Sequence, residues 1–335
     1  MPSSAAALLL SHYDLHARAL PWRSPPGMPP PDPYRVWLSE VMLQQTTVTT
    51  VSPRFRHFID RWSSVQALAA ASLDDVLHEW AGLGYYARAR NLHACARRVA
   101  ESGGFPDSEA ALRQLPGIGA YTAAAIAAIA FGEPVAAVDT NVERVIARLH
   151  GIARPLAEAH SEIRDLARAM VPRDRPGDFA QAMMDLGATI CRPRNPDCSR
   201  CPLASGCAAF ASGEPGLFPA SKAKQVRPRR HGIAWWIERG GALWLVRRPS
   251  RGLLGGMPSL PGNEWGDGAE SGPALAEVEH LFTHFALDLR IEARPAAPDG
   301  PGWWQPLDRI ADAGLPTLYA RAVAAVLARK TALAA

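Results

Sequence analysis

Apolar residues recur at helical spacing through the first two thirds of the chain, separated by short polar or glycine-containing turns. The longest such run covers residues 34–50, and its apolar positions share one helix face (Trp37, Leu38, Val41, Met42 and Val48). Other periodic segments predict helices at residues 8–20, 64–70, 72–80, 86–101, 108–113, 122–131, 142–149, 158–170 and 178–190. Helices joined by such short turns are typical of a helical bundle. The pattern therefore predicts a mainly α-helical region over residues 1–211.

The pattern changes after residue 211. Residues 212–230 are basic and rich in proline, which is typical of a linker between domains. Beyond the linker the apolar period shortens to two, and Arg239-Gly240-Gly241 has the composition of a hairpin turn. The elements predicted there are strands at residues 233–238, 242–247 and 281–293 and a helix at residues 317–330. We expect a small α+β domain over residues 231–335.

Length and composition place the chain in an ordinary class. Its 335 residues suffice for two or three domains, and 48% hydrophobic and 20% charged residues are usual for a globular protein. Lys and Arg outnumber Asp and Glu by 36 to 32, and the resulting charge of +4 permits a polyanionic partner without requiring one. No apolar run approaches the roughly 18 residues of a membrane span, and a signal peptide is not recognisable. We expect a cytoplasmic monomer with no membrane partner, nucleoid-associated if the source is bacterial.

Residues 114–122, Gln-Leu-Pro-Gly-Ile-Gly-Ala-Tyr-Thr, lead directly into an alanine-rich predicted helix. Gly117 and Gly119 let backbone N–H groups approach an anion at the positive end of that helix, as in a phosphate clamp. No Rossmann or P-loop unit surrounds the stretch, which favours a helix–hairpin–helix gripping a DNA backbone over a nucleotide site. A purely structural turn stays an alternative, since lone Gly-x-Gly turns between helices are common.

Two carboxylates stand out against their surroundings. Glu40 lies in the apolar run of residues 34–50, where a buried position would raise its pKa. The alternative is an exposed Glu on the polar face of that helix, beside Ser39 and Gln44. Asp139 precedes the predicted helix 142–149 and could cap it, near whatever the phosphate clamp holds.

The start of helix 142–149 has a second candidate cap. Thr140 and Glu143 have the spacing of a capping box, so the cap could be Thr140 instead of Asp139.

Residues 82–88, Gly-Leu-Gly-Tyr-Tyr-Ala-Arg, place aromatic rings beside positive charge. Tyr85, Tyr86 and Arg88 together suit stacking on nucleobases. The alternative is that both tyrosines are ordinary core residues.

Four of the five cysteines fall within residues 191–207, in the spacing Cys-x6-Cys-x2-Cys-x5-Cys. Four thiolates so close together can surround one tetrahedral zinc ion or one [4Fe–4S] cube, and the spacing alone does not decide between them. The ligands would be Cys191, Cys198, Cys201 and Cys207. Cys95 has no partner at metal-ligand spacing and is expected in the core.

Taken together, these segments resemble one family over essentially the whole chain. The resemblance rests on five stretches: Leu20-Pro21-Trp22-Arg23, residues 37–46 (Trp-Leu-Ser-Glu-Val-Met-Leu-Gln-Gln-Thr), residues 82–88, the Gly-rich hairpin with Asp139, and the cysteine loop. They are similar to MutY-type adenine DNA glycosylases of the endonuclease III superfamily. The resemblance implies a six-helix module at about residues 25–135 and a cluster module from residues 1–24 and 136–211. It also implies a [4Fe–4S] cluster and, as partner, duplex DNA containing adenine opposite 8-oxoguanine or guanine.

The resemblance implies a role for each candidate residue. Glu40 would protonate the departing adenine, while Asp139 would stabilise the oxocarbenium-like sugar. Asn141 would orient these carboxylates and the water, and Tyr121 would lie beside the same pocket. The residues implied in contacting or entering the duplex are Gln44, Gln45, Tyr85, Arg88, Gly117 and Gly119.

Residue 121 separates two sister activities. Superfamily members that also cut the strand have a lysine there, which forms a Schiff base with the sugar, whereas Tyr121 implies simple hydrolysis. An endonuclease III-like glycosylase and lyase is the alternative enzyme. A DNA-binding protein that uses its cluster for structure or redox sensing is the non-enzymatic alternative, and it leaves Glu40 without a role.

The C-terminal domain resembles the Nudix-like lesion-reading domain of the same family. The similarity lies in residues 252–257 (Gly-Leu-Leu-Gly-Gly-Met) and in Phe282-Thr283-His284. No Arg-Glu-x-x-Glu-Glu pattern supplies the glutamates that hold Mg²⁺ in a working Nudix hydrolase, so the domain should bind and not hydrolyse. Thr283 stands where the family usually has Ser, which keeps the hydroxyl but adds a methyl group.

Overall fold

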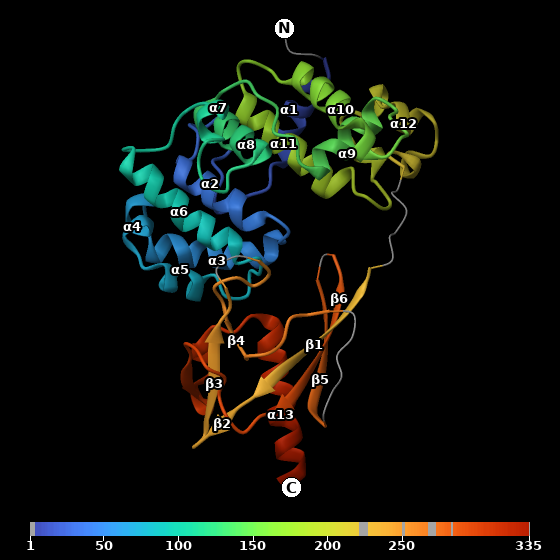
Figure 1. Cartoon of the computed structure of the whole chain (residues 1–335). Helices are drawn as coiled ribbons and strands as arrows, with labels where there is room; N and C mark the ends of the chain where they lie inside the picture. The colour runs from blue at the N-terminus through green and yellow to red at the C-terminus, as the bar shows by residue number, and fades with distance from the viewer. Residues whose placement is uncertain (1–3, 221–226, 250–251, 267–272, 283, 335) are drawn as a thin grey trace. The chain divides into compact units, whose positions relative to one another are not determined.

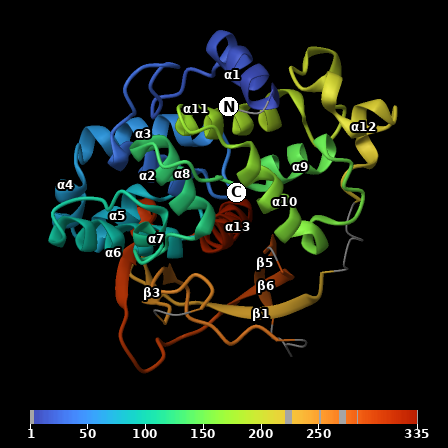
Figure 2. The ribbon, with the colours of Figure 1, turned by 90° about the horizontal axis from the view of Figure 1, so that it is seen from above.

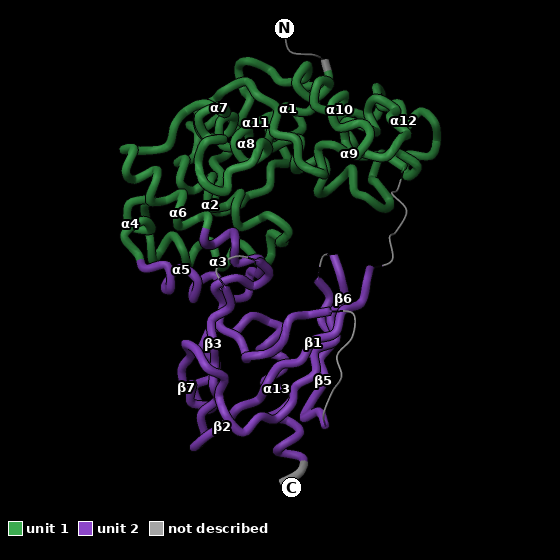
Figure 3. Tube along the Cα trace, in the orientation of Figure 1, with its two compact units in different colours: residues 1–71, 91–223 green, residues 72–90, 224–335 purple. Residues whose placement is uncertain are grey.

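The computed structural model describes residues 4–220, 227–249, 252–266, 273–282 and 284–334. The chain divides into two compact units (Figure 3). The first contains residues 1–71 and 91–223, and the second contains residues 72–90 and 224–335. The chain combines a helical part with an α+β part, which confirms the predicted fold class.

Helices account for nearly all of the regular structure before the linker (Figure 1). In chain order they are α1 (Ser4–His16), α2 (Pro33–Leu43), α3 (Val48–Arg61), α4 (Val65–Ala70), α5 (Leu73–Glu79), α6 (Ala87–Glu101), α7 (Glu109–Leu112), α8 (Ala120–Phe131), α9 (Thr140–Leu149), α10 (Leu156–Met170) and α11 (Pro176–Asp185). A π-helix, η1 (Leu186–Ile190), continues α11. Short turns follow: η2 (Cys198–Arg200), η3 (Ala204–Gly206), α12 (Ala208–Ala211) and η4 (Pro215–Leu217).

Helix α8 is the centre of the first unit, because its alanine-rich sequence lets neighbouring helices approach closely. It packs against α2, α7 and α11, and its residues from Thr122 to Ile129 are buried. At the start of α11, a Cβ on Gly177 would lie 2.7 Å from the carbonyl oxygen of Ala128. This backbone-to-backbone approach brings α2, α8 and α11 around one cavity.

A second apolar cluster joins α1, α9, α10 and α11 within the same unit. Its buried members include Leu9, Ile146, Ile163 and Phe179. Figure 2 shows α1 beside α11 and α10 beside α9, as their packing contacts require. This cluster fixes α9, and therefore the residues at its start, against the rest of the unit.

Three expectations about helix bounds are wrong. Residues 34–50 do not form one helix: α2 ends at Leu43, Gln45 has a φ of 57°, and Thr47 begins α3 by accepting a hydrogen bond from the backbone N–H of Thr50. The first helix covers Ser4–His16 instead of residues 8–20. Residues 178–190 also change from α-helix to π-helix after Asp185. The apolar pattern continues through the breaks after Leu43 and Asp185, because the residues that follow each break still face the core.

The start of α9 decides between the two predicted caps. Asp139 is the cap, since its side chain accepts a 2.7 Å hydrogen bond from the backbone N–H of Val142. The capping box of Thr140 and Glu143 is wrong, because the Glu143 carboxylate accepts instead from His160 at 2.6 Å.

The second unit contains two small sheets. Its strands are β1 (Arg229–Trp236), β2 (Glu238–Arg239), β3 (Ala242–Arg247), β4 (Pro258–Ser259), β5 (Ala274–Leu281), β6 (Ala286–Ala293) and β7 (Trp303–Pro306), followed by η5 (Leu307–Ala313) and α13 (Thr317–Ala334). One sheet has the order β1-β6-β5, with β1 parallel to β6, and the other places β3 beside β2, β4 and β7. Helix α13 packs on β5 and β6 around a shared apolar core.

The predicted hairpin turn is confirmed, but the predicted strand at residues 233–238 is divided: residues 233–236 belong to β1, which pairs with β6, and only β2 pairs with β3. The predicted strand at residues 281–293 is also wrong. Gly240 and Gly241 connect β2 to β3 with φ of 57° and 73°, which a two-residue hairpin turn requires and glycine adopts readily. Residues 281–293 are interrupted by a turn, in which the N–H of Phe282 donates to the carbonyl of Phe285 at 2.9 Å. Strand β5 before that turn was not predicted, since its Ala-Leu-Ala-Glu-Val-Glu-His-Leu sequence alternates weakly. The predicted linker also contains η4 and the first residues of β1.

No helix among the described residues is long and apolar enough to cross a membrane.

Candidate functional site

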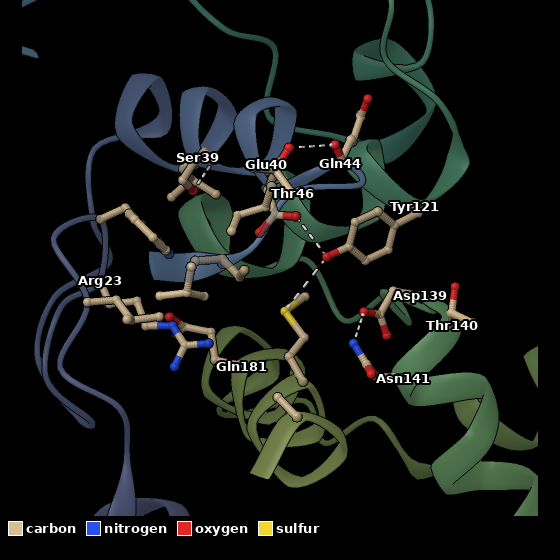
Figure 4. A pocket seen from close by; sticks show the side chains of 18 of the residues that line it. Arg23, Ser39, Glu40, Gln44, Thr46, Tyr121, Asp139, Thr140, Asn141 and Gln181 are labelled. Carbon is tan, nitrogen blue, oxygen red and sulfur yellow. Dashed lines mark hydrogen bonds between the residues drawn. The ribbon is translucent and has the colours of Figure 1, made fainter. Parts of the chain in front are cut away.

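A cavity of about 690 Å³ in the first unit brings together most of the residues predicted to do chemistry. It lies among α2, α8, the start of α9 and α11, as Figure 4 shows from close by. Its lining includes Glu40, Tyr121, Asp139 and Asn141, together with Gln44 and Gln45. Segments more than 90 residues apart in the chain therefore contribute to one site.

Glu40 is buried, with 6% of its surface exposed, so the exposed alternative is wrong. It lies on α2 between the fully buried Trp37 and the partly buried Leu43. The pKa of Glu40 is raised to about 7: burial is the main cause and the nearby Asp139 adds to it, while the hydrogen bond from Tyr121 and the charge of Arg23 act in the opposite direction. A carboxylic acid with this pKa is protonated in a large fraction of molecules at neutral pH and can donate its proton.

Tyr121 fixes the orientation of that acid. Its hydroxyl donates to Oε2 of Glu40 at 2.7 Å and also lies 3.8 Å from the sulfur of Met184 (Figure 4). Burial and the neighbouring carboxylates raise the pKa of Tyr121 well above its usual value, so the phenol keeps its proton and remains the donor. Because Oε2 accepts this bond, the acidic proton of Glu40 is carried by Oε1.

Asp139 is held by two hydrogen bonds at the start of α9. Oδ1 accepts from the backbone N–H of Val142 at 2.7 Å, and Oδ2 accepts from Nδ2 of Asn141 at 2.9 Å (Figure 4). The positive end of the helix dipole favours a negative charge at this position. The arrangement presents a fixed carboxylate in the same cavity as the protonated Glu40.

Arg144 in turn holds Asn141 in place. Arg144 was not predicted from the sequence. Its Nη2 donates to Oδ1 of Asn141 and to the carbonyl of Gly187, both at 2.8 Å, while its Nε donates to the carbonyl of Cys191 at 2.9 Å. The side chain is buried, although it is charged, because these acceptors replace water. Its position one helical turn after Asn141 is the signal that could have identified it.

Arg18 and Arg23 line another wall of the cavity, and Asp185 binds both of them. Asp185, with 7% exposed, accepts from Nε of Arg18 at 2.7 Å and from Nη1 of Arg23 at 2.8 Å. Gln181 lies on the same helix and is also buried, and its Oε1 has no hydrogen-bond partner among the described residues. Arg23 belongs to the quoted Leu-Pro-Trp-Arg stretch, whereas Asp185 and Gln181 carried no signal in the sequence.

The predicted hairpin forms between α7 and α8. Gly117 has a φ of 74°, and a Cβ there would lie 2.6 Å from Cβ of Asn91, so only glycine fits. Gly119 caps α8 with open space around it. At the mouth of the cavity, Gln44 donates from Nε2 to the hydroxyl of Thr122 at 3.4 Å, and Gln45 is exposed.

The four cysteines of the loop line one cavity, which Arg148 closes on one side (Cys191, Cys198, Cys201 and Cys207). Nη1 of Arg148 donates to Sγ of Cys191 at 3.4 Å, and Sγ of Cys207 donates to the carbonyl of Arg148 at 3.4 Å. Across the residues that the structure covers, no three His, Cys, Asp or Glu side chains are grouped as they are around a metal ion. Four thiols around one shared space are a donor set for either a zinc ion or a [4Fe–4S] cube, whose irons each take one thiolate. Cys95 is fully buried elsewhere, as predicted.

The remaining predicted residues belong to the second unit. Tyr86 is buried, as expected of a core residue. Tyr85 is 52% exposed with a φ of 47°, so its ring is accessible, as stacking on a nucleobase would need. Arg88 lies over the rings of Trp80 and Tyr85 and donates to the carbonyl of Leu83 at 2.8 Å, which holds this turn together.

Of the three predicted lesion-reading residues, two are described. The ring of Phe282 stacks on Trp265, and His284 is exposed. Thr283 lies outside the described residues.

Comparison with known proteins decides the family. Residues 38–183 match the HhH-GPD superfamily of base excision DNA repair proteins, and residues 233–325 match the NUDIX domain. The adenine DNA glycosylase of Mus musculus is 35% identical over 88% of this chain and 72% of its own length. The chain belongs to the adenine DNA glycosylases. The relative from Mycolicibacterium smegmatis is 44% identical over 62% of this chain and 70% of its own length. The Homo sapiens relative is 37% identical over 84% of this chain, which spans 65% of that relative.

Solved structures agree with the helical fold. A thermostable thymine-DNA glycosylase is 29% identical, with a TM-score of 0.55, and covers 62% of this chain and 95% of its own. A trapped endonuclease III–DNA intermediate, at 22% identity and a TM-score of 0.52, shows the same fold. The chain therefore joins the helix–hairpin–helix fold to a C-terminal Nudix-like domain, as the sequence predicted.

Proposed function

We propose that this DNA glycosylase hydrolyses the N-glycosidic bond of adenine mispaired with 8-oxoguanine or guanine in duplex DNA. The observation that carries the proposal is the pair of unlike carboxyl groups in one cavity: Glu40, buried with a pKa of about 7, and Asp139, which caps the start of α9. Glycoside hydrolysis divides its work between such an acid and such a carboxylate.

The reaction follows from these two groups. Glu40 gives the proton on Oε1 to a ring nitrogen of adenine, and the electrons of the breaking C1′–N bond pass to the base. Asp139 stabilises the positive charge that develops on the sugar. Water then adds to C1′ and returns a proton to Glu40, which leaves free adenine, an abasic sugar and the original enzyme. Asn141, fixed by Arg144, keeps the Asp139 carboxylate oriented through these steps.

The same cavity supports a monofunctional mechanism. Cutting the strand by a Schiff base needs an amine that attacks C1′. None of the residues that line the described cavity is a lysine, and Tyr121 has only a protonated phenol to offer. We therefore expect hydrolysis without strand cleavage.

The proposal assigns DNA and lesion contacts to the rest of the chain. The Gly117–Gly119 hairpin with α8 behind it suits a backbone phosphate. Gln44, Gln45, Tyr85 and Arg88 would meet the duplex near the extruded base. We propose domain bounds at residues 1–211 and 231–335, with the latter reading 8-oxoguanine through Phe282, Thr283 and His284. The protein would act as a monomer in the cytoplasm, nucleoid-associated if bacterial.

The cysteine loop is proposed to hold a [4Fe–4S] cluster through Cys191, Cys198, Cys201 and Cys207. Bound there, the cluster supplies a cross-link within the loop. Arg148 donates to the carbonyls of Arg192 and Pro193, so the chain itself holds the loop that carries the first two ligands. Protein purified without air should be brown and contain iron and sulfide. Colourless, fully active protein with stoichiometric zinc would contradict the cluster.

The test of function is a labelled duplex with adenine opposite 8-oxoguanine, scored for strand breaks with and without alkali. We expect breaks only after alkali, and loss of the signal in Glu40→Gln by at least the ~10²–10⁴ typical of a missing general acid. An exposed glutamate substituted alike, Glu101→Gln, is the matched control. Near-normal turnover by Glu40→Gln, or strand breaks without alkali, would contradict the mechanism.

A further inference from the structure

A stack of aromatic rings lies beneath the turn that contains the predicted lesion-reading residues. The rings of Trp265 and Phe282 are stacked, with centroids 5.6 Å apart and planes at 27°. Phe285 contacts Phe282 at 4.9 Å and Trp265 at 6.4 Å, and His280 meets the edge of Phe282 at 4.6 Å. Phe282 is therefore enclosed by rings from both arms of its turn and from a segment before β5.

The position of Trp265 is fixed by backbone pairing and by a glycine. Its segment lies along β1, where His231 and Gly266 exchange hydrogen bonds of 2.7 and 3.0 Å and Ala234 pairs with Gly262. The ring crosses Gly232 so closely that a Cβ there would lie 2.4 Å from its Cδ1. A glycine at residue 232 is thus a condition for seating the indole at this place.

Arg248 joins a second loop to the same ring. Its guanidinium carbon lies 4.8 Å from the centroid of Trp265, Nη1 donates to the hydroxyl of Tyr319 at 3.0 Å, and Nε donates to the carbonyl of Leu253 at 3.2 Å. Leu253 belongs to the Gly-Leu-Leu-Gly-Gly-Met stretch, one of the two segments that resemble the lesion-reading domain. Trp265 therefore contacts, directly or through Arg248, both of those segments.

We propose that Trp265 is a positioning residue for discrimination of the base opposite adenine, and that Arg248 and Gly232 seat it. The inference rests on the proposed function, in which Phe282, Thr283 and His284 read 8-oxoguanine. Trp265 itself touches no DNA: it restricts Phe282 to one orientation, so the exposed His284 is presented to the base without first being ordered. A loop ordered in advance binds more tightly, because less conformational freedom is lost on binding. The benefit applies only to a base that the turn contacts, so binding opposite guanine should not depend on Trp265.

The experiment uses the full-length protein and a duplex with a non-cleavable adenine analogue opposite either 8-oxoguanine or guanine. Trp265→Leu should lower the ratio of the two affinities by roughly three- to tenfold, the worth of one aromatic pair, with the change confined to the 8-oxoguanine duplex. Trp265→Phe, which keeps a stacking ring, should restore most of the ratio. Trp304→Leu is the matched control, since Trp304 also lies under an arginine, Arg239, but away from this turn, and it should leave the ratio unchanged.

The outcomes separate the inference from the proposed function. If the native protein shows no preference for 8-oxoguanine, the proposed function fails and the inference with it. If the native protein discriminates and Trp265→Leu keeps the full ratio, the inference alone is overturned. Equal weakening on both duplexes would also overturn it, because a merely structural role predicts that result. Should Trp265→Leu not fold, Arg248→Gln keeps the indole but removes its tie to Leu253, and it should change the ratio in the same direction, whereas an unchanged ratio would refute the inference.

Discussion

The hydrogen bond between Tyr121 and Glu40 sets the pH at which the acid works. Burial holds the pKa of Glu40 near 7, while the bond from Tyr121 lowers it from a still higher value. A general acid with a pKa near 7 is still largely protonated at neutral pH and yet acidic enough to give up its proton. Tyr121 thus does more than occupy the place of a lysine.

We expect the single-turnover rate of adenine excision to fall as pH rises through about 7, because the fraction of protonated Glu40 decreases. Tyr121→Phe removes a bond that favours the carboxylate, so it should move this decline to higher pH. Rates measured from pH 6 to 9 with enzyme in excess give the pH of the decline for the native protein and for the variant. A decline at the same pH in the variant would show that Tyr121 does not tune the acid.

The buried acid should also cost stability. Since the pKa of Glu40 is raised from 4.5 unfolded to about 7 folded, the folded state binds more protons between these values. The free energy of unfolding should therefore decrease as pH rises from 4.5 to 7, by roughly 3 kcal/mol from this group. Glu40→Gln lacks this titration. The difference in unfolding free energy between the variant and the native protein should therefore shift in favour of the variant from pH 4.5 to 7 and stay constant above pH 7. Denaturant unfolding at pH 4.5 and 8 measures this, and a difference independent of pH would count against a buried acid.

At the scale of elements, the turns and helix ends carry the functional groups. Asp139 starts α9, Gly119 starts α8, and Gln44 and Gln45 occupy the break between α2 and α3. Each end leaves backbone groups without helical partners, so it can bind an anion or aim a side chain. The helices around the cavity hold these ends in place through apolar packing.

The two hairpin glycines should respond differently to alanine. Gly117→Ala meets Asn91 and needs a φ of 74°, so we expect a loss of about 1–2 kcal/mol in stability and weaker DNA binding. Gly119→Ala enters open space at an ordinary φ and should leave the melting temperature unchanged. Thermal unfolding separates the two variants. Equal destabilisation by both would mean that the turn is not shaped as described.

Sequence periodicity predicted elements better than it predicted their ends. It identified most of the helices, the β2–β3 turn and α13, because each has a face that must be buried, but it did not predict α3 as a separate helix. It missed the break after Leu43, the turn at Phe282 and the π-helix after Asp185, because residues on both sides of each break still face the core. The site followed the same rule: Glu40 and Asp139 stood out chemically, whereas Arg144, Gln181 and Asp185 acquire their places only from tertiary packing.

At the scale of the whole molecule, the proposed chemistry and the proposed lesion reading lie in different parts of the chain. The cavity is built from residues of the first unit alone, and the Trp265 stack from residues of the second alone. Two such sites can change independently in evolution. They can also be tested independently.

Removing residues 227–335 should leave adenine excision in place but reduce the preference for 8-oxoguanine over guanine. The reason is that every group assigned to the chemistry precedes the linker, whereas the groups assigned to the lesion follow it. The measurement is excision on both duplexes by intact and truncated protein, with folding checked by circular dichroism. Equal loss of activity on both would indicate that the second part is a general DNA clamp.

Arg144 has a consequence for how the protein responds to damage. Its guanidinium donates to the carbonyl of Cys191, the first residue of the cysteine loop, and to the side-chain amide of Asn141. Asn141 in turn donates to Asp139. A chain whose loop has failed to assemble, or has been oxidised, should therefore also misplace its catalytic carboxylate. Activity per molecule should follow the occupancy of the proposed iron–sulfur cluster as the cysteines are progressively oxidised, while Arg144→Gln should be poorly active even at full occupancy. Abasic sites are toxic intermediates, and this linkage would keep a damaged repair enzyme from producing them.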